Sequence, residues 1–277
     1  MTAPLLARLG YQEDEVVVIV SCDELGFCHA ANVATYELLR AGRATSSSLM
    51  VPAPWARSAA ASYQGDDVGV HLTLISELDR YRWGPITQAP SLLDGDGAFP
   101  RTVDDLWEHA DLDEVRRELR AQIERAVLWG IGVTHLVTHV DTTLGRPEFF
   151  DVFLDLAEDF HLPIRLIGAD EERSVGFPLR ELVAQREVVT PDSVISLSQL
   201  GDDAEAVVHA IAEFAPGVHE IICRVALETD ELRNATPQWE ERTQANALLR
   251  AMNWEQMKIT LTNYRAMAGL MRKDATH

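Results

Sequence analysis

Four residues of types that bind metal ions lie at the ends of hydrophobic runs in this chain. Asp23 and Glu24 close the run VVVIVSCDEL, His71 lies near the end of VGVHLTL, and His139 ends VTHLVTH. Two imidazoles and a carboxylate are a common ligand set for a catalytic Zn²⁺ or a similar divalent ion, with positions left open for water. We therefore predict that these residues converge on one metal site.

Each of these residues also has a purely structural interpretation. A carboxylate pair after a strand often caps a helix or faces solvent, and a single histidine in an apolar strand is more often a buried core residue. His135 lies four residues before His139, so both point to the same face of a strand, and we expect the deeper His135 to be structural. The joint position of the candidates after three separate strands favours the metal site.

The elements that must position these residues alternate along the chain. Short β-branched runs and amphipathic segments follow one another, the runs at 16–20, 44–51, 68–74 and 133–139 and the segments at 30–41, 55–63, 111–129 and 148–160. Further strands are expected near 164–167, 193–197, 219–224 and 257–262. This pattern is typical of parallel strands joined by helices, and catalytic groups of such barrels lie where the strands end. We predict one α/β domain over 1–277, a parallel β/α barrel of about eight strands.

The periodicity fails over about 75–110, where Pro, Gly, Asp and Trp are frequent. Long irregular segments in compact domains are usually functional or disordered, and this one directly follows the strand that carries His71. We interpret it as an insertion that covers the substrate. Its DGDG stretch lacks the ligand spacing of a calcium loop, so we expect a turn there.

Composition narrows the function. The chain has 277 residues and a formal net charge of −20, so nucleic acid would be repelled by most of the surface. Neither a signal peptide nor an apolar stretch of about 18 residues is found, so we expect a cytoplasmic protein that does not bind membranes. The three cysteines lack C-x-x-C spacing, and we expect them to serve packing rather than a disulfide, a zinc site or a nucleophile. A homodimer is a possible assembly because dimers are the commonest soluble oligomers.

Several motifs, in order, match one family. S-C-D-E-L-G stands where the family has approximately N-A-D-D-F-G, and Asn32 and T-S-S-S-L-M-V (45–51) follow as in the family. The family's G-x-H-L-T-L appears as G-V-H-L-T-L at 69–74, and P-T-H-x-D-S-H as V-T-H-L-V-T-H, ending at His139. The segments at 90–99 and 216–221 match as well. The chain thus resembles the YdjC-like carbohydrate deacetylases, the group of chitooligosaccharide and hopanoid-associated deacetylases.

The resemblance implies a mononuclear site on a distorted TIM-like (β/α) barrel. Its ligands would be Glu24, His71 and His139, with Asp23 as the base that activates a water bound to Mg²⁺ or Zn²⁺. The substrate would be a small N-acetylated carbohydrate. Trp83, together with Tyr81 and Trp107, could stack on sugar rings, although aromatic residues in a long loop pack against the barrel at least as often.

Two departures from the family pattern concern the ligands. Glu24 replaces the second Asp of the opening pair, and its extra methylene would move the carboxylate by ~1.5 Å on a fixed backbone. Asp141 lies two residues after His139, where the family has other residues. It could be an added acidic ligand, a loop acid, or a residue that orients His71 through a hydrogen bond, and we favour the last interpretation.

The third departure is Arg224, which stands where relatives carry a histidine that could donate a proton. Arginine does not release its proton at any useful pH, so it cannot be the general acid. Another group could donate the proton, turnover could be weak, or Arg224 could bind a different substrate. We therefore keep two alternatives to deacetylation, a barrel that binds a carbohydrate or small ligand with little catalysis, and a metal hydrolase for another amide or ester.

Overall fold

A parallel β-sheet forms the centre of the molecule. The computed structural model describes residues 4–274, apart from the side chains of 169–171 and 273–274. Six strands follow the order β4-β3-β2-β1-β6-β5, and the short β7 pairs with β1. The strands are β1 (Val16–Leu25), β2 (Ser46–Leu49), β3 (Val68–Leu72), β4 (Val133–Thr138), β5 (Ser193–Ser196), β6 (Gly217–Arg224) and β7 (Thr260–Leu261).

The two edges of this sheet meet at one residue, Ile164. Ile164 forms a parallel bridge with Leu136 of β4, where Arg165 N donates to Leu136 O at 3.0 Å. On its other side, Ile164 N donates to Val189 O at 2.9 Å, in the segment that leads into β5. These hydrogen bonds link β4, through the segment at Ile164, to the chain that leads into β5, as expected for the distorted barrel that the resemblance implies.

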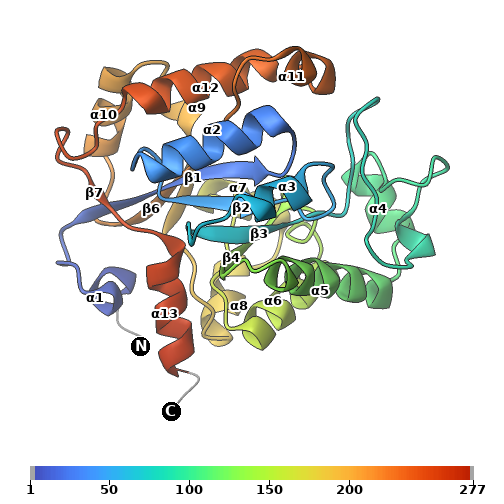
Figure 1. Cartoon of the computed structure of the whole chain (residues 1–277). Helices are drawn as coiled ribbons and strands as arrows, with labels where there is room; N and C mark the ends of the chain where they lie inside the picture. Colours follow the sequence, from blue (N-terminus) through green and yellow to red (C-terminus); the bar gives the residue numbers. More distant parts are fainter. Residues whose placement is uncertain (1–3, 275–277) are drawn as a thin grey trace.

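Helices cover the outside of the barrel (Figure 1). They are α1 (Leu5–Leu9), α2 (His29–Arg40), α3 (Ala56–Ala61), α4 (Val103–His109), α5 (Leu112–Leu128), α6 (Pro147–Phe160), α7 (Ala169–Val175), α8 (Leu179–Gln185), α9 (Leu197–Leu200), α10 (Ala204–Ala212), α11 (Asp230–Ala235), α12 (Trp239–Ala251) and α13 (Tyr264–Asp274). α2 and α12 lie on the β1 side, and α5 and α6 lie beside β3 and β4. No helix in the described part of the chain is long and apolar enough to cross a membrane.

The period of two along β1 separates two apolar clusters. Val17 and Ile19 belong to the larger cluster, whereas Val18, Val20 and Cys22 pack in a second one with residues of α2, α10 and α12. Alternate side chains of a strand point to opposite faces, so Asp23 continues the face of Val17 and Ile19. The strand thereby turns the Asp23 carboxylate into the barrel interior.

The sequence-based elements agree with the structure except in two places. The strand expected at 164–167 is reduced to the bridge at Ile164, and that expected at 257–262 to Thr260–Leu261. The described residues hold seven strands and this bridge, which agrees with the predicted count of about eight. The cysteines Cys22, Cys28 and Cys223 are free and buried, as expected.

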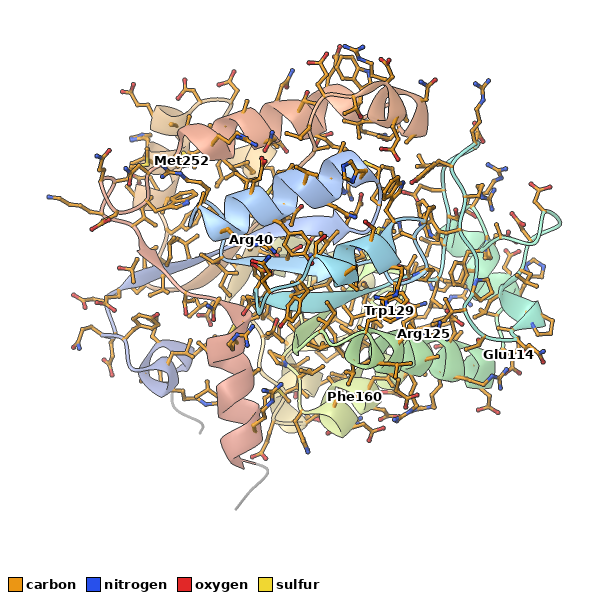
Figure 2. All side chains as sticks on the ribbon, viewed as in Figure 1. Arg40, Glu114, Arg125, Trp129, Phe160 and Met252 are labelled. Carbon is orange, nitrogen blue, oxygen red and sulfur yellow. The ribbon has the colours of Figure 1, made fainter. Side chains whose placement is uncertain are left out.

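The insertion over about 75–110 is packed against the barrel. Leu92, Phe99 and Leu106 are fully buried in the larger apolar cluster. Glu114, labelled at the start of α5 in Figure 2, accepts hydrogen bonds from both N and Oγ of Ser91 at 2.8 Å. The insertion includes a short 3-10 helix (Pro90–Leu92) and leads into α4. Its expected role as a substrate cover stays a prediction.

Candidate active site

Asp23 lies near the carboxyl end of β1, between β2 and β6. Arg165 binds its carboxylate with both terminal nitrogens, Nη1 to Oδ2 at 2.7 Å and Nη2 to Oδ1 at 2.9 Å. Ser48 Oγ donates to Oδ1 at 3.0 Å. Burial raises the pKa of Asp23, but the charge of Arg165 outweighs it, so the pKa lies below its ordinary value. Asp23 is therefore a fixed, ionised carboxylate.

His71 and His139 face each other beside this carboxylate. His71 Nε2 and His139 Nδ1 are 3.2 Å apart. Burial lowers the pKa of His71 to about 3, so its ring is neutral. The Ser48 hydroxyl donates its hydrogen bond to Asp23, so in its 2.8 Å contact with His71 Nδ1 the serine oxygen is the acceptor and Nδ1 is the donor. Consequently Nε2 of His71, which points at His139, carries a lone pair.

The far nitrogen of His139 is bound by the insertion. Its Nε2 lies 3.0 Å from Glu77 Oε2. Burial alone would raise the pKa of Glu77, but the hydrogen bond with His139 outweighs this effect, so the pKa lies below its ordinary value and Glu77 is an ionised acceptor. The hydrogen bond with Glu77 uses Nε2 of His139, so Nδ1 is the ring nitrogen that faces His71. The 3.2 Å contact between the two nitrogens needs a proton or a metal ion between them.

The geometry of the two imidazoles fits one metal ion. Two nitrogens each ~2.1 Å from an ion, with an angle of about 100° between the bonds, lie as far apart as these do. A carboxylate bound to the far nitrogen, as Glu77 is, is the usual support of a metal-ligating histidine. Within the described residues, however, no group of three or more His, Cys, Asp or Glu is arranged to hold a metal. The distance between His71 and His139 therefore suits a metal ion, whereas the predicted set of Glu24, His71 and His139 is not arranged around one.

Glu24 is the residue that leaves the set incomplete. Its Oε1 forms an ion pair with Arg224 Nε at 2.7 Å, and its Oε2 accepts a hydrogen bond from Arg242 Nη2 at 2.5 Å. Burial would raise the pKa of Glu24, but the two arginines hold it well below its ordinary value. Its backbone is left-handed, with φ of 64°, which costs about 1–3 kcal/mol in a residue with a side chain. The extra methylene anticipated from the sequence thus carries the carboxylate to the arginines.

Arg224 ends β6 directly beside Asp23, its register partner on β1. Its side chain is 47% exposed, in contrast to the 6% of Arg242. Two of the departures from the family pattern, Glu24 and Arg224, therefore contact each other. Each side chain neutralises the charge of the other, so the two replacements form one ion pair and are not independent of each other.

The remaining predicted residues have other surroundings. Trp83 is only 4% exposed, donates from Nε1 to Ile75 O at 2.8 Å, and stands edge-on to His139 at 6.1 Å between ring centroids. This burial leaves little of its ring for a sugar, and its position instead supports His139. Asp141 is exposed and left-handed, with φ of 52°, as is Val140 at 50°. Backbone strain directly after His139 is typical of functional sites, and the role of Asp141 stays a prediction.

A cavity of about 480 Å³ opens beside Asp23 and Arg224. Ile222, Leu197 and Leu248 contribute apolar surface to it. Its polar lining includes Asp23, Ser196, Ser198, Arg224, Glu241 and Gln244. A mixed lining with several hydrogen-bonding groups suits a small polar ligand with apolar faces.

Sequence reasoning missed four residues of this site, Ser48, Glu77, Arg165 and Arg242. Ser48 lies in the T-S-S-S-L-M-V motif, which was noted without a role for its serines. Arg165 was within reach, because it follows the predicted strand start at Ile164. Glu77 and Arg242 gave no signal, since one lies in the irregular insertion and the other on a helix 218 residues from its partner. His135, expected to be structural, is fully buried and stacked on Tyr264 at 3.8 Å between ring centroids.

Fold and site together define a parallel β/α barrel with a histidine–carboxylate cluster at the carboxyl ends of its strands. The family model described as YdjC-like protein matches residues 17–261 of this chain. The chain belongs to this family, as its motifs predicted.

Two relatives and one solved structure illustrate the relationship. A carbohydrate deacetylase of Thermus thermophilus is 36% identical over 242 residues, which cover 86% of this chain and 87% of the relative. A carbohydrate deacetylase of Brevibacillus brevis is 35% identical over 163 residues, 56% of this chain and 62% of the relative. The crystal structure of a putative cellobiose-phosphate cleavage protein from Enterococcus faecalis superposes with a TM-score of 0.77 at 24% identity, covering 92% of this chain and 99% of the other. This last likeness supports the fold.

Proposed function

We propose that this chain is a hydrolase that removes the acetyl group from an N-acetylated carbohydrate. The observation that carries the proposal is the pair His71–His139, whose ring nitrogens face each other at 3.2 Å, next to the fixed carboxylate of Asp23. Family membership and the names of the relatives, carbohydrate deacetylases, supply the reaction and the substrate class. The cavity that Asp23 helps to line, but that neither His71 nor His139 lines, is the proposed space for the sugar.

Asp23 is the proposed base. A carboxylate has about four lone-pair sites. Oδ1 accepts from Ser48 and Arg165, whereas Oδ2 accepts from Arg165 alone among the side chains described. Oδ2 can therefore take a proton from water as the water oxygen bonds to the acetyl carbon. The same proton then passes to the amine nitrogen as the C–N bond breaks, leaving acetate and the free amino sugar. This route needs no proton from Arg224.

A divalent ion at the histidine pair is part of the proposal. His71 Nε2 and His139 Nδ1 would hold it, and imidazole ligands favour Zn²⁺ over Mg²⁺. When bound, such an ion polarises a carbonyl and lowers the pKa of water. Arg165 keeps Asp23 ionised and oriented for its proton transfer, and Glu77 keeps His139 in the tautomer that turns Nδ1 inward.

The proposal is tested by acetate release from di-N-acetylchitobiose. We expect Asp23→Asn and His71→Ala to lose at least ~100-fold in kcat/KM, since general base catalysis contributes about that much or more. Asp96→Asn, in an exposed ion pair of the insertion, is the control and should keep wild-type activity. Full activity in His71→Ala would refute the proposed site.

A second candidate is a barrel that binds a carbohydrate and turns it over slowly or not at all. The engagement of both Glu24 oxygens by arginines favours it, because the described residues then form no group of three metal-binding side chains at the histidine pair. Sugar binding measured by calorimetry, with no acetate released from any N-acetylated sugar and none from simple acetyl esters, would select this candidate over a hydrolase.

A further inference from the structure

A second cavity, of about 280 Å³, lies at the amino end of β4. Its walls come from the ends of α5 and α6, from the start of β4 and from α13. One lining residue, Phe160 at the end of α6, is labelled in Figure 2. His139 follows the opposite end of the same strand, so this cavity is separate from the candidate active site.

Most of the wall of this second cavity is apolar. The lining hydrophobic side chains are Ile123, Val127, Ile131, Val133, Phe160 and Leu162. Val127 is 53% exposed, so part of this apolar wall faces water. Covering such surface with an apolar group is favourable in proportion to the area removed from water. The cavity therefore suits a ligand with an apolar body.

The polar part of the wall carries positive charge. Arg265 and Arg272 are seven residues apart on α13, about two helical turns, so both lie on one face of that helix. Arg265 Nη2 donates to the carbonyl oxygens of Gly65 and Asp66. Arg272 Nη2 donates to the carbonyl oxygen of Val133 at 3.2 Å. In the part of the chain that the structure describes, neither guanidinium pairs with a carboxylate.

Asp67 is the buried carboxylate that contacts this part of α13. Its Oδ2 accepts from the backbone N of Arg265 at 2.7 Å, and its Oδ1 accepts from the hydroxyls of Ser46 and Thr134. Asp67 is close enough to offset part of the charge of Arg265, although the guanidinium itself donates to carbonyls. Arg272 is therefore the guanidinium with more charge left for a ligand.

We propose that this second cavity binds a small organic anion, a monocarboxylate with an apolar body such as a medium-chain fatty acid. The apolar tail lies on Val127 and Phe160, and the carboxylate faces Arg272 and Arg265. In a chain with a formal net charge of −20, two arginines beside an apolar hollow are the feature that selects an anion. Each guanidinium has five N–H donors, more than its carbonyl contacts use, and can bind a carboxylate with two of them.

The test is isothermal titration of the full chain with sodium octanoate at low salt. We expect saturable binding to one site, in the millimolar range or tighter. Each methylene removed from the ligand should weaken binding by up to ~4-fold, because less apolar surface is covered. 1-Octanol, which has the same tail and no charge, should bind at least ~5-fold more weakly. Absence of saturable octanoate binding, or equal affinity for octanoate and 1-octanol, would overturn the inference.

Two neighbouring residues of α5 provide matched variants. Val127 lines the cavity, whereas Leu128 is 78% exposed and does not line it. Val127→Glu places a carboxylate beside the two arginines and should weaken octanoate binding at least ~10-fold, because it repels the ligand and competes for its partners. Leu128→Glu adds the same charge outside the cavity and should keep the affinity within ~2-fold of wild type. Equal losses in the two variants would contradict binding in this cavity.

The arginines are tested by the same titration. Arg272→Gln should weaken octanoate binding at least ~5-fold, and Arg265→Gln should weaken it less. Arg250 pairs with Glu37 and does not line the cavity, so Arg250→Gln removes an arginine elsewhere and should leave the affinity within ~2-fold of wild type. Melting curves confirm that each variant is folded. Wild-type affinity in Arg272→Gln would show that this arginine only ties α13 to the start of β4, and would overturn the inference.

Discussion

Arg165 is the side chain on which the interior of the barrel depends most directly. It is 10% exposed and binds two buried carboxylates, Asp23 with Nη1 and Nη2, and Glu220 with Nε and Nη2. Its Nη2 also donates to Ser21 Oγ at 3.1 Å. Replacement by Met keeps the apolar stem and removes the charge, so both carboxylates stay inside the protein without their cation.

We expect Arg165→Met to destabilise the fold by about 3–5 kcal/mol, the usual effect of removing one partner from a buried ion pair. In a chain of 277 residues, with an unfolding entropy of about 2.1 cal/mol/K per residue, this lowers the melting temperature by roughly 5–9 °C. The control Arg186→Met removes an arginine that also binds two carboxylates, Asp155 and Glu158, but is 32% exposed. Its loss should lower the melting temperature by at most about 2 °C.

The effect of Arg165→Met on the stability of the fold should depend on pH. In the wild type the pKa of Asp23 is below its ordinary value, so the pairing stabilises the fold above about pH 4 and is lost as the pH falls through the folded pKa. In Arg165→Met the main positive charge beside Asp23 is gone, and burial raises this pKa against only His71 and Arg224, so the poorly paired charge destabilises the fold at neutral pH and is lost on acidification. The melting temperatures of wild type and Arg165→Met should differ less at pH 4.5 than at pH 7. A difference below about 2 °C at pH 7, or a larger difference at pH 4.5, would refute the reasoning.

Three further predictions concern the supports of the site. A Cβ at Gly69 would lie 2.5 Å from both the ring and the carbonyl oxygen of His135, so Gly69→Ala should destabilise the fold by about 1–3 kcal/mol or more. Gly269 in α13 has open space around it, so Gly269→Ala should stabilise the fold by up to ~1 kcal/mol. Equal melting temperatures for the two variants would contradict this prediction. Glu77→Gln should weaken Zn²⁺ binding ~10–100-fold in calorimetry, and wild-type affinity would show that Glu77 does not support His139. Trp83→Ala should lower stability by about 3–5 kcal/mol in thermal unfolding, whereas a variant that melts like wild type yet loses sugar affinity would restore the sugar-stacking interpretation.

The sequence identified the residues whose position depends on strand ends alone. Asp23, His71 and His139 each follow a β-branched run, and the rule that parallel strands end on one side of a barrel places them together. This requires no knowledge of distances. The structure accordingly brings His71 and His139 into contact and links Asp23 to His71 through Ser48.

The rest of the site depends on side-chain conformations that periodicity does not encode. Glu24 turns to the arginines because its backbone is left-handed and its side chain is long enough to reach them. Arg165 reaches Asp23 from a residue 142 positions away in sequence, on a strand that is almost absent. Trp83 is buried because the irregular insertion folds onto the barrel, a tertiary effect that local composition does not predict.

The closure of the barrel at Ile164 has a consequence for motion. Along β1 and β6 the register is continuous over eight residue pairs, whereas the edges near Ile164 are joined by a few backbone hydrogen bonds. Regions with few such bonds open at lower free energy than the core of a sheet, so amide protons at Leu136 and Ile164 should exchange with solvent before those of Val18 and Ile19. Arg165 follows Ile164 directly. Each local opening of the hydrogen bonds at Ile164 should also displace Arg165, the residue that orients Asp23. The frequency of such openings would then determine how often the Asp23 carboxylate loses its orientation.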